Sequence, residues 1–260
     1  MNKNNNADPI SEGFRNPPDN ITDPCLVYMA RVMDLRKFIA FVFGYIKTSA
    51  ELAKLIPEDQ HKQLHEGTFK LLRYSYSEHR QLVNEIMLSR AVESFDLYLT
   101  TILRDIFIAR PEMLKSEATV DISTIIDAGN YENLIWQIVD RKVHDLSYKS
   151  LSDLRKFITS RTNIDIFSSE SMFEIVLIAS EIRNLIAHND CVINDQFKSK
   201  IGTTKIPLDV TSTGKIKIDD EWLRRASYTL DGIVFRFDEL ASKKFDLLTR
   251  FRSGAFLLRD

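Results

Sequence analysis

The chain has 260 residues, with 35 basic and 37 acidic side chains and a formal net charge of −2 at pH 7. This balance excludes a global electrostatic attraction to nucleic acid, so any phosphate contacts must be local. Only 8 Gly and 7 Pro are present, about half the average usage. The deficit argues against a turn-rich sandwich or barrel and favours long helices.

Residues 1–24 are predicted to be a flexible tail. They are rich in Asn and contain the Pro17-Pro18 pair and Asp23-Pro24. Such a composition buries too little apolar surface to offset the entropy lost on ordering. It also contains no apolar core typical of a signal peptide. We expect one folded domain over residues 25–260.

The cysteine pattern and the hydropathy favour a cytoplasmic protein without a membrane segment. Cys25 and Cys191 are far apart and form no CxxC pair, which suits a reducing compartment. The most apolar run, residues 38–46, has 9 residues, whereas a bilayer span needs about 20. We interpret this run as part of the core or of a dimer interface.

The N-terminal half shows helical periodicity. One helix is expected from residue 25 to about 56, ended by Pro57, and a more polar one over 58–73. The clearest lies between about 78 and 109 and ends before Pro111. Its apolar positions are separated by 3, 4, 4, 3 and 4 residues, as one helical stripe requires. They are Leu88, Ala91, Phe95, Leu99, Ile102 and Ile106.

The C-terminal half predicts shorter helices and one hairpin. Residues 118–130 are expected to form a loop or short structure, followed by helices over 131–144 and 150–159. Ser171 and Glu174 have the spacing of a capping box and predict the start of another helix. Apolar alternation on both sides of 211–214 predicts a β-hairpin at about 205–218. Asp219 or Asp220 is expected to cap a last long helix.

The expected fold class is therefore all-α: a helical bundle with a small β-hairpin inserted before its last long helix.

One segment, residues 181–190, combines groups that can carry chemistry. On a helix, Asn184 and His188 stand one turn apart on the polar face, with Glu181 beside them. Arg183 lies at the border between the polar and apolar faces. An ordinary ion pair on the helix surface would also explain this arginine.

These three side-chain types suit phosphodiester chemistry without a metal. An imidazole titrates near neutrality and can give or take a proton. A guanidinium offers a planar fork of donors to a phosphate and stabilises charge on its oxygens. An amide can orient the ribose hydroxyl or the imidazole. The candidate site therefore comprises Arg183, Asn184 and His188.

Residues 183–188, Arg-Asn-Leu-Ile-Ala-His, resemble the R-x4–6-H motif of the HEPN superfamily (higher eukaryotes and prokaryotes nucleotide-binding domain). The polar residue that follows the motif arginine is Asn184. Residues 89–107, with Arg110-Pro-Glu-Met-Leu114 after them, look like the long helix of prokaryotic HEPN-like proteins. The resemblance extends over residues 80–240 and is specific around 181–190.

This resemblance implies an all-α bundle acting as a metal-independent endoribonuclease with no cofactor. By position, His188 would be the general acid/base, Arg183 the phosphate-binding residue and Asn184 the polar orienter. Attack by the ribose 2′-hydroxyl would leave a 2′,3′-cyclic phosphate and a 5′-hydroxyl. Only RNA has this internal nucleophile, so DNA should be inert.

The resemblance also implies partners. HEPN proteins commonly form homodimers in which the motifs of two protomers face each other across one cleft. They typically act as toxins or effectors in phage defence, abortive infection or toxin–antitoxin systems, so an antitoxin or activating partner is expected.

Several alternatives stay open at this stage. A helical module that binds RNA, a nucleotide or a partner protein without catalysis would use the same residues. Asp190 departs from the Gly or basic residue that often follows the motif histidine, and it could depress activity or hold Arg183 between turnovers. His61 and His65 have a spacing that can bind zinc, but without further ligands a solvated face is favoured and no metal site is expected. The C-terminal aromatic residues, among them Phe235, are expected to pack rather than contact RNA.

Overall fold

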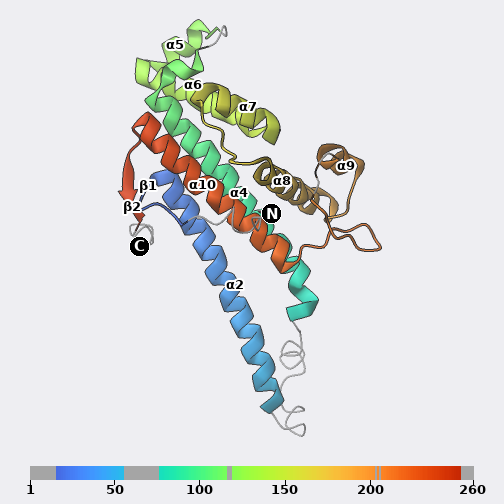
Figure 1. The fold of residues 1–260 in the computed structure, drawn as a ribbon. Helices are drawn as coiled ribbons and strands as arrows, with labels where there is room; N and C mark the ends of the chain where they lie inside the picture. Colours follow the sequence, from blue (N-terminus) through green and yellow to red (C-terminus); the bar gives the residue numbers. More distant parts are fainter. Residues whose placement is uncertain (1–15, 56–75, 116–118, 203, 205, 253–260) are drawn as a thin grey trace, which may run out of the picture.

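The structure is a computed structural model that describes residues 16–55, 76–115, 119–202, 204 and 206–252 (Figure 1). Three long helices run side by side: α2 (Asp23–Leu55), α4 (Tyr76–Ala109) and α10 (Asp220–Phe245). Both α2 and α10 pack along α4. The predicted all-α fold is confirmed, and α4 ends before Pro111 as expected.

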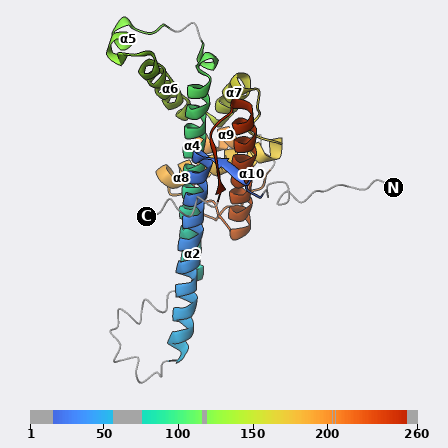
Figure 2. The same cartoon turned by 90° about the vertical axis from the view of Figure 1, so that its left-hand side faces the viewer.

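Shorter helices pack on α4 in the views of Figures 1 and 2. Both α6 (Tyr131–Ser147) and α8 (Glu170–Asn189) contact α4, and α8 also contacts α10. Between α6 and α8 in the chain lies α7 (Leu151–Thr162). The remaining elements are β1 (Asn20–Thr22), the 3₁₀ helix η2 (Pro111–Leu114), α5 (Ile122–Ala128), α9 (Asp195–Ile201) and β2 (Thr249–Phe251).

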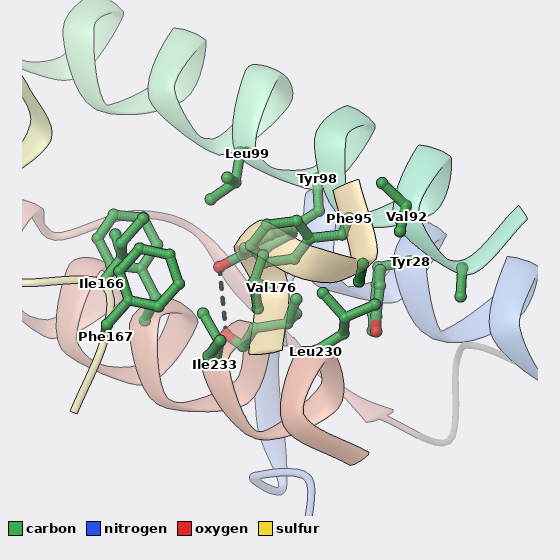
Figure 3. Packing of buried hydrophobic residues seen from close by; sticks show 14 of the residues in the cluster. Tyr28, Val92, Phe95, Tyr98, Leu99, Ile166, Phe167, Val176, Leu230 and Ile233 are labelled. Atoms are coloured by element: carbon green, nitrogen blue, oxygen red, sulfur yellow. Dashed lines mark hydrogen bonds between the residues drawn. The ribbon is translucent and has the colours of Figure 1, made fainter. Parts of the chain in front are cut away.

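The core is built around α4, as its apolar stripe predicts. All six residues of the predicted stripe are buried, and Phe95, Ile102 and Ile106 have no exposed surface. Figure 3 shows Phe95 and Leu99 of α4 facing Val176 of α8 and Ile233 of α10. Because each fully buried side chain of this size contributes about 1.5–3 kcal/mol, this stripe holds the helices around α4 together.

The predicted tail boundary at residue 24 is wrong, because the chain is ordered before that point. Residues 20–22 form β1, which pairs antiparallel with β2, with Ile21 opposite Arg250. Ile21 is fully buried, and α2 already begins at Asp23. Apolar burial of Ile21 and pairing with the segment after α10 therefore offset the ordering entropy of residues 20–24.

A buried carboxylate on α10 joins three elements. Asp238 is fully buried and accepts hydrogen bonds from the Thr22 amide (3.1 Å) and the Thr22 hydroxyl (2.5 Å). It also accepts one from the Tyr98 hydroxyl of α4 (3.3 Å). Burial raises the pKa of Asp238, and the hydrogen bonds from Thr22 and Tyr98 act in the opposite direction.

The predicted hairpin at about 205–218 is present only as isolated pairs. Val210 bridges Ile216 around the turn at 211–214, and neither side extends into a strand. The Ile216 amide donates instead to the Cys191 carbonyl. The Ile216 carbonyl and the Ile218 backbone bond to side chains of α4, namely Gln81 and Asn84. The segment also bridges the stretch after α8, where Val192 pairs with Lys215. These contacts, together with burial of Ile216 and Ile218, account for the apolar alternation although no full strand forms.

The apolar run at residues 38–46 does not belong to the core. Phe38, Phe41 and Tyr45 are exposed, whereas Ile39 and Phe43 line a pocket with residues of α4 and α10. Its alternative role in a dimer interface stays a prediction. Over the described ranges, no helix is long and apolar enough to cross a membrane. The predicted polar helix at 58–73 lies outside the described residues.

Asp238→Asn should lower the free energy of unfolding by about 1–3 kcal/mol, because the NH2 group that replaces one carboxylate oxygen cannot accept the hydrogen bond made there. Urea denaturation measures this change. The control Glu221→Gln, exposed on the same helix, should stay within about 0.5 kcal/mol of wild type. Equal stability of wild type and Asp238→Asn would show that this carboxylate does not hold the helices.

The same pair of proteins should differ in its pH dependence. Because the native pKa of Asp238 is raised above the unfolded value, the native state holds a proton that the unfolded chain has released. Stability contributed by Asp238 therefore falls as pH rises from about 4 through the raised native pKa. The difference in unfolding free energy between wild type and Asp238→Asn should shrink over this range. A difference that grows with pH would contradict the raised pKa.

Candidate functional site

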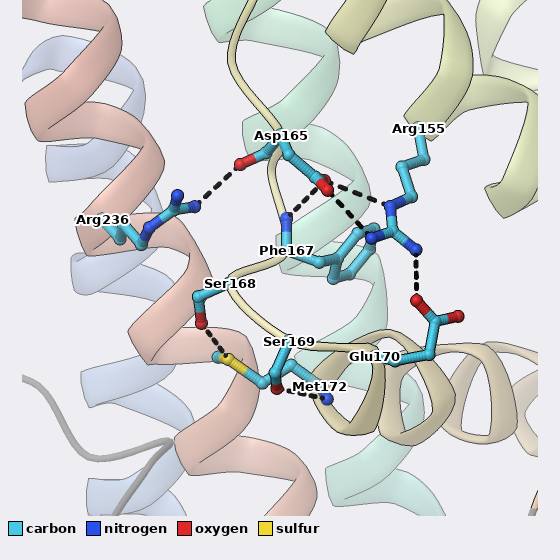
Figure 4. Close-up of polar contacts among 8 residues, drawn as sticks. All are labelled: Arg155, Asp165, Phe167, Ser168, Ser169, Glu170, Met172 and Arg236. Atoms are coloured by element: carbon cyan, nitrogen blue, oxygen red, sulfur yellow. Dashed lines mark hydrogen bonds and ion pairs between the residues drawn. The ribbon is translucent and has the colours of Figure 1, made fainter.

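The start of α8, the helix that bears the candidate residues, is held by a polar cluster (Figure 4). Arg155 of α7 donates two hydrogen bonds to Asp165, at 3.1 and 2.9 Å, and one to Glu170 at 2.9 Å. Arg236 of α10 donates to the Asp165 carbonyl at 2.8 Å. Burial tends to raise the pKa of Asp165, but hydrogen bonds from Arg155 and the Phe167 amide lower it overall.

The N-terminal cap of α8 differs from the prediction. Ser169, not Ser171, caps the helix, and its hydroxyl accepts from the Met172 amide at 3.3 Å. Serine occurs at 168, 169 and 171, so several residues have the right chemistry for a cap. The helix therefore begins two residues earlier than predicted, next to the point where Arg155 binds Asp165 and Glu170.

The apolar face of α8 points into the core and its polar face points outward, as predicted. Ile178, Ile182 and Leu185 are buried, whereas Asn184 is half-buried and His188 is exposed. The two faces of residues 178–188 inferred from helical geometry are therefore confirmed.

Arg183 forms an ion pair with the neighbouring helix α4. Its Nη2 lies 3.0 Å from Oδ2 of Asp96, and its Nη1 donates to Oδ1 of Asn184 at 3.3 Å. Among the described residues no acceptor reaches its buried Nε. The alternative interpretation of Arg183, an ion pair, is thus correct for its contact in this structure.

Asp96 is the site residue that sequence reasoning missed. Its contact with Arg183 links residues 87 positions apart, and nothing local in the sequence indicates it. Partial burial raises the pKa of Asp96, while the charge of Arg183 acts in the opposite direction. The side chains of Asp96 and Arg183 keep 49% and 31% of their surface exposed, so solvent screens the pair.

Arg183 and Asn184 line a groove of about 600 Å³ between α4, α8 and the turn that joins α6 to α7. Glu181 and Lys200 lie in the same lining and bind each other, with Nζ–Oε distances of 2.8 and 2.9 Å. The lining also has a large apolar part, which includes Leu99, Leu103, Leu146, Leu154 and Leu177.

His188 is not brought into this groove. It lies in the last turn of α8, one turn beyond Asn184, and is exposed. In the part of the chain that the structure describes, no side chain forms a hydrogen bond with its imidazole. The structure therefore places Arg183 and Asn184 together and leaves His188 at the end of the same helix.

Asp190 does not hold Arg183. It ends α8 in the left-handed conformation, with φ of 48°, and its Oδ1 accepts from Lys215 Nζ at 3.0 Å. Lys215 also lies 3.4 Å from Glu85. The carboxylate that approaches Arg183 is Asp96 instead.

The cysteines and the possible metal ligands among the described residues do not form a second catalytic or metal site. Cys25 and Cys191 are free and buried, and burial raises the pKa of both thiols, that of Cys191 to about 11, so neither is an activated nucleophile. No metal-binding group of three or more His, Cys, Asp or Glu occurs within the described ranges, and His61 and His65 lie outside them. Of the five C-terminal phenylalanines expected to pack, Phe235, Phe237 and Phe245 are buried, Phe251 is exposed, and Phe256 lies outside the described residues.

Comparisons with family models, with curated proteins and with solved structures found no match.

Asp96→Asn should leave the fold intact and free the guanidinium for anions. Because the ion pair with Arg183 is partly exposed, its loss should change the free energy of unfolding by less than about 1 kcal/mol. Removing a negative charge at this distance should strengthen binding of inorganic phosphate about five-fold, the effect of about 1 kcal/mol in water. An NMR titration measures the affinity.

The matched control is Glu221→Gln, which removes an exposed carboxylate of α10 that does not line the groove and should not alter phosphate affinity. Weaker phosphate binding by Asp96→Asn would mean that Asp96 positions Arg183 rather than competing with the anion.

Proposed function

We propose that the protein is a metal-independent endoribonuclease of the HEPN type, with RNA as substrate and no cofactor. The observation that carries this proposal is that α8 presents the guanidinium of Arg183 and the amide of Asn184 in one groove, with the exposed imidazole of His188 one turn further. These are the groups of the R-x4–6-H motif, on a single rigid helix.

In the proposed reaction, Arg183 binds the scissile phosphate. A guanidinium has five N–H donors, and only two of those of Arg183 are used in the contacts with Asp96 and Asn184. A phosphate replacing Asp96 would receive bidentate hydrogen bonds that stabilise charge on its oxygens in the transition state.

His188 acts as general acid/base and Asn184 orients the reacting groups. The imidazole removes a proton from the ribose 2′-hydroxyl or protonates the leaving 5′-oxygen. The new bond joins the 2′-oxygen to phosphorus while the bond from phosphorus to the 5′-oxygen breaks. The products are a 2′,3′-cyclic phosphate and a 5′-hydroxyl.

We further propose that the active form is a homodimer in which two α8 motifs share one cleft. The position of His188 outside the groove supports this arrangement, because a second copy could bring its own imidazole to Arg183. The biological role that fits is a cytoplasmic toxin or defence effector, with an antitoxin or activating partner that covers or opens the cleft.

A second candidate function is non-catalytic binding of RNA, a nucleotide or a partner protein through the same groove. The ion pair between Arg183 and Asp96 favours it, because the guanidinium is already neutralised. A folded dimer that binds RNA and never cleaves it would select this alternative.

Arg183→Ala and His188→Ala should each abolish most cleavage of synthetic RNA in EDTA. Loss of a general acid/base is expected to cost about 10²–10⁴-fold, and loss of a charge-stabilising donor about 10²–10³-fold. The assay follows initial rates and maps the product ends. Urea denaturation establishes that both variants stay folded.

Matched controls separate site chemistry from loss of any surface charge. His79→Ala and Arg90→Ala remove an exposed imidazole and an exposed guanidinium on α4 and should cleave like wild type. Cleavage that survives in both Arg183→Ala and His188→Ala would show that the wrong residues have been named.

Mixing Arg183→Ala with His188→Ala should restore cleavage if each active centre combines arginine from one protomer with histidine from the other. In an equal mixture half of the twofold dimers are mixed, and each has one intact centre, so the expected activity is about a quarter of wild type. No recovery, with subunit exchange demonstrated, would contradict a shared centre.

A further inference from the structure

The turn between α6 and α7 forms one wall of the groove, and its side chains have no role in the proposed cleavage reaction. Residues 147–150, Ser-Tyr-Lys-Ser, lie in the same lining as Arg183. Tyr148 is 79% exposed, so its ring is accessible to a ligand in the groove. Its ring meets the edge of His144 at a centroid distance of 5.0 Å and an angle of 77°.

The groove lining combines charged, polar and apolar side chains, and its two carboxylates, Asp96 and Glu181, are each paired with a cation. Arg183 and Asn184 stand on α8 and Tyr148 and Lys149 on the α6–α7 turn, with leucines such as Leu146 and Leu151 in the same lining. Lys149 has no carboxylate within ion-pair distance among the residues that the structure describes. A ligand that fits has a flat, weakly polar part as well as negative charge.

We infer that this turn binds a base of single-stranded RNA, with Tyr148 stacking on the base while Arg183 holds an adjacent phosphate. The inference rests on the proposed function, since it names the form of RNA that the same groove accepts. An aromatic ring beside basic side chains is the usual combination for single-stranded nucleic acid. Lys149 supplies a second phosphate contact.

Duplex RNA does not meet these requirements. Its bases are stacked on each other, and a side chain cannot reach their faces without unstacking them. The groove should therefore select unpaired nucleotides, in loops or at ends, whatever sequence they have, because every base offers a π-face.

The experiment measures binding without cleavage, by fluorescence anisotropy of a labelled 12-nucleotide single-stranded DNA, which has bases and phosphates but no 2′-hydroxyl. Tyr148→Ala should weaken binding about 5- to 100-fold, the range that base–aromatic stacking produces on alanine substitution. Tyr148→Phe keeps the ring and should bind like wild type. Tyr131→Ala removes a tyrosine that is exposed at the start of α6, outside this groove, and should also bind like wild type.

An abasic oligonucleotide of the same length isolates the base from the phosphate. Tyr148→Ala and wild type should bind it equally, whereas Lys149→Ala should weaken binding of both probes. Equal affinity of Tyr148→Ala and wild type for the normal probe would overturn the inference. An equal loss on both probes, or no binding of the normal probe by wild type, would also overturn it.

These outcomes are independent of the cleavage assay. If binding depends on the base through Tyr148 but the protein cuts no RNA, the stacking role of Tyr148 is upheld and the proposed ribonuclease activity is rejected. If cleavage depends on Arg183 and His188 but Tyr148 has no effect on binding, the ribonuclease activity is upheld and the stacking role of Tyr148 is rejected.

Discussion

The carboxylate of Asp238 is the contact on which the arrangement of the long helices depends. It lies fully buried on α10 and receives hydrogen bonds from Thr22, just before α2, and from Tyr98 on α4. Charged groups are costly to bury unless hydrogen bonds compensate, so the three elements must meet at this point. Tyr98 is two residues from Asp96 on α4, and its hydrogen bond acts together with the buried stripe of this helix, which includes Phe95 and Leu99, to turn Asp96 toward α8.

The candidate site depends on this rotation and on the anchored start of α8. Together they bring the carboxylate of Asp96 within 3.0 Å of Arg183, with an open groove beside the pair. The guanidinium is thus held by a contact that is weak because it is partly exposed. A phosphate could displace Asp96 without disturbing the fold, and this exchange is what the proposed nuclease requires of Arg183.

Much of the fold was predictable because helical periodicity and caps are local signals. The stripe on α4 and the Asp219 cap of α10 are both present. The β1–β2 pair was not predictable, because it joins Ile21 to Arg250 and short strands carry little pattern. The polar and apolar faces of α8 were foreseen because helical periodicity is local. Asp96 and Tyr148 were not foreseen, because they lie far from α8 in the sequence. Their roles arise only when separate helices are packed together.

The central claim is that the α8 groove cleaves RNA through the substrate's own 2′-hydroxyl. The most direct measurement uses a synthetic RNA with one mapped cleavage position, remade with a single 2′-deoxy nucleotide on the 5′ side of that phosphate and incubated in EDTA. The account predicts that cleavage at this phosphate disappears, while the unmodified RNA yields a 2′,3′-cyclic phosphate, because no other nucleophile is available. Cleavage at the deoxy position, or a product with a 5′-phosphate, would contradict it.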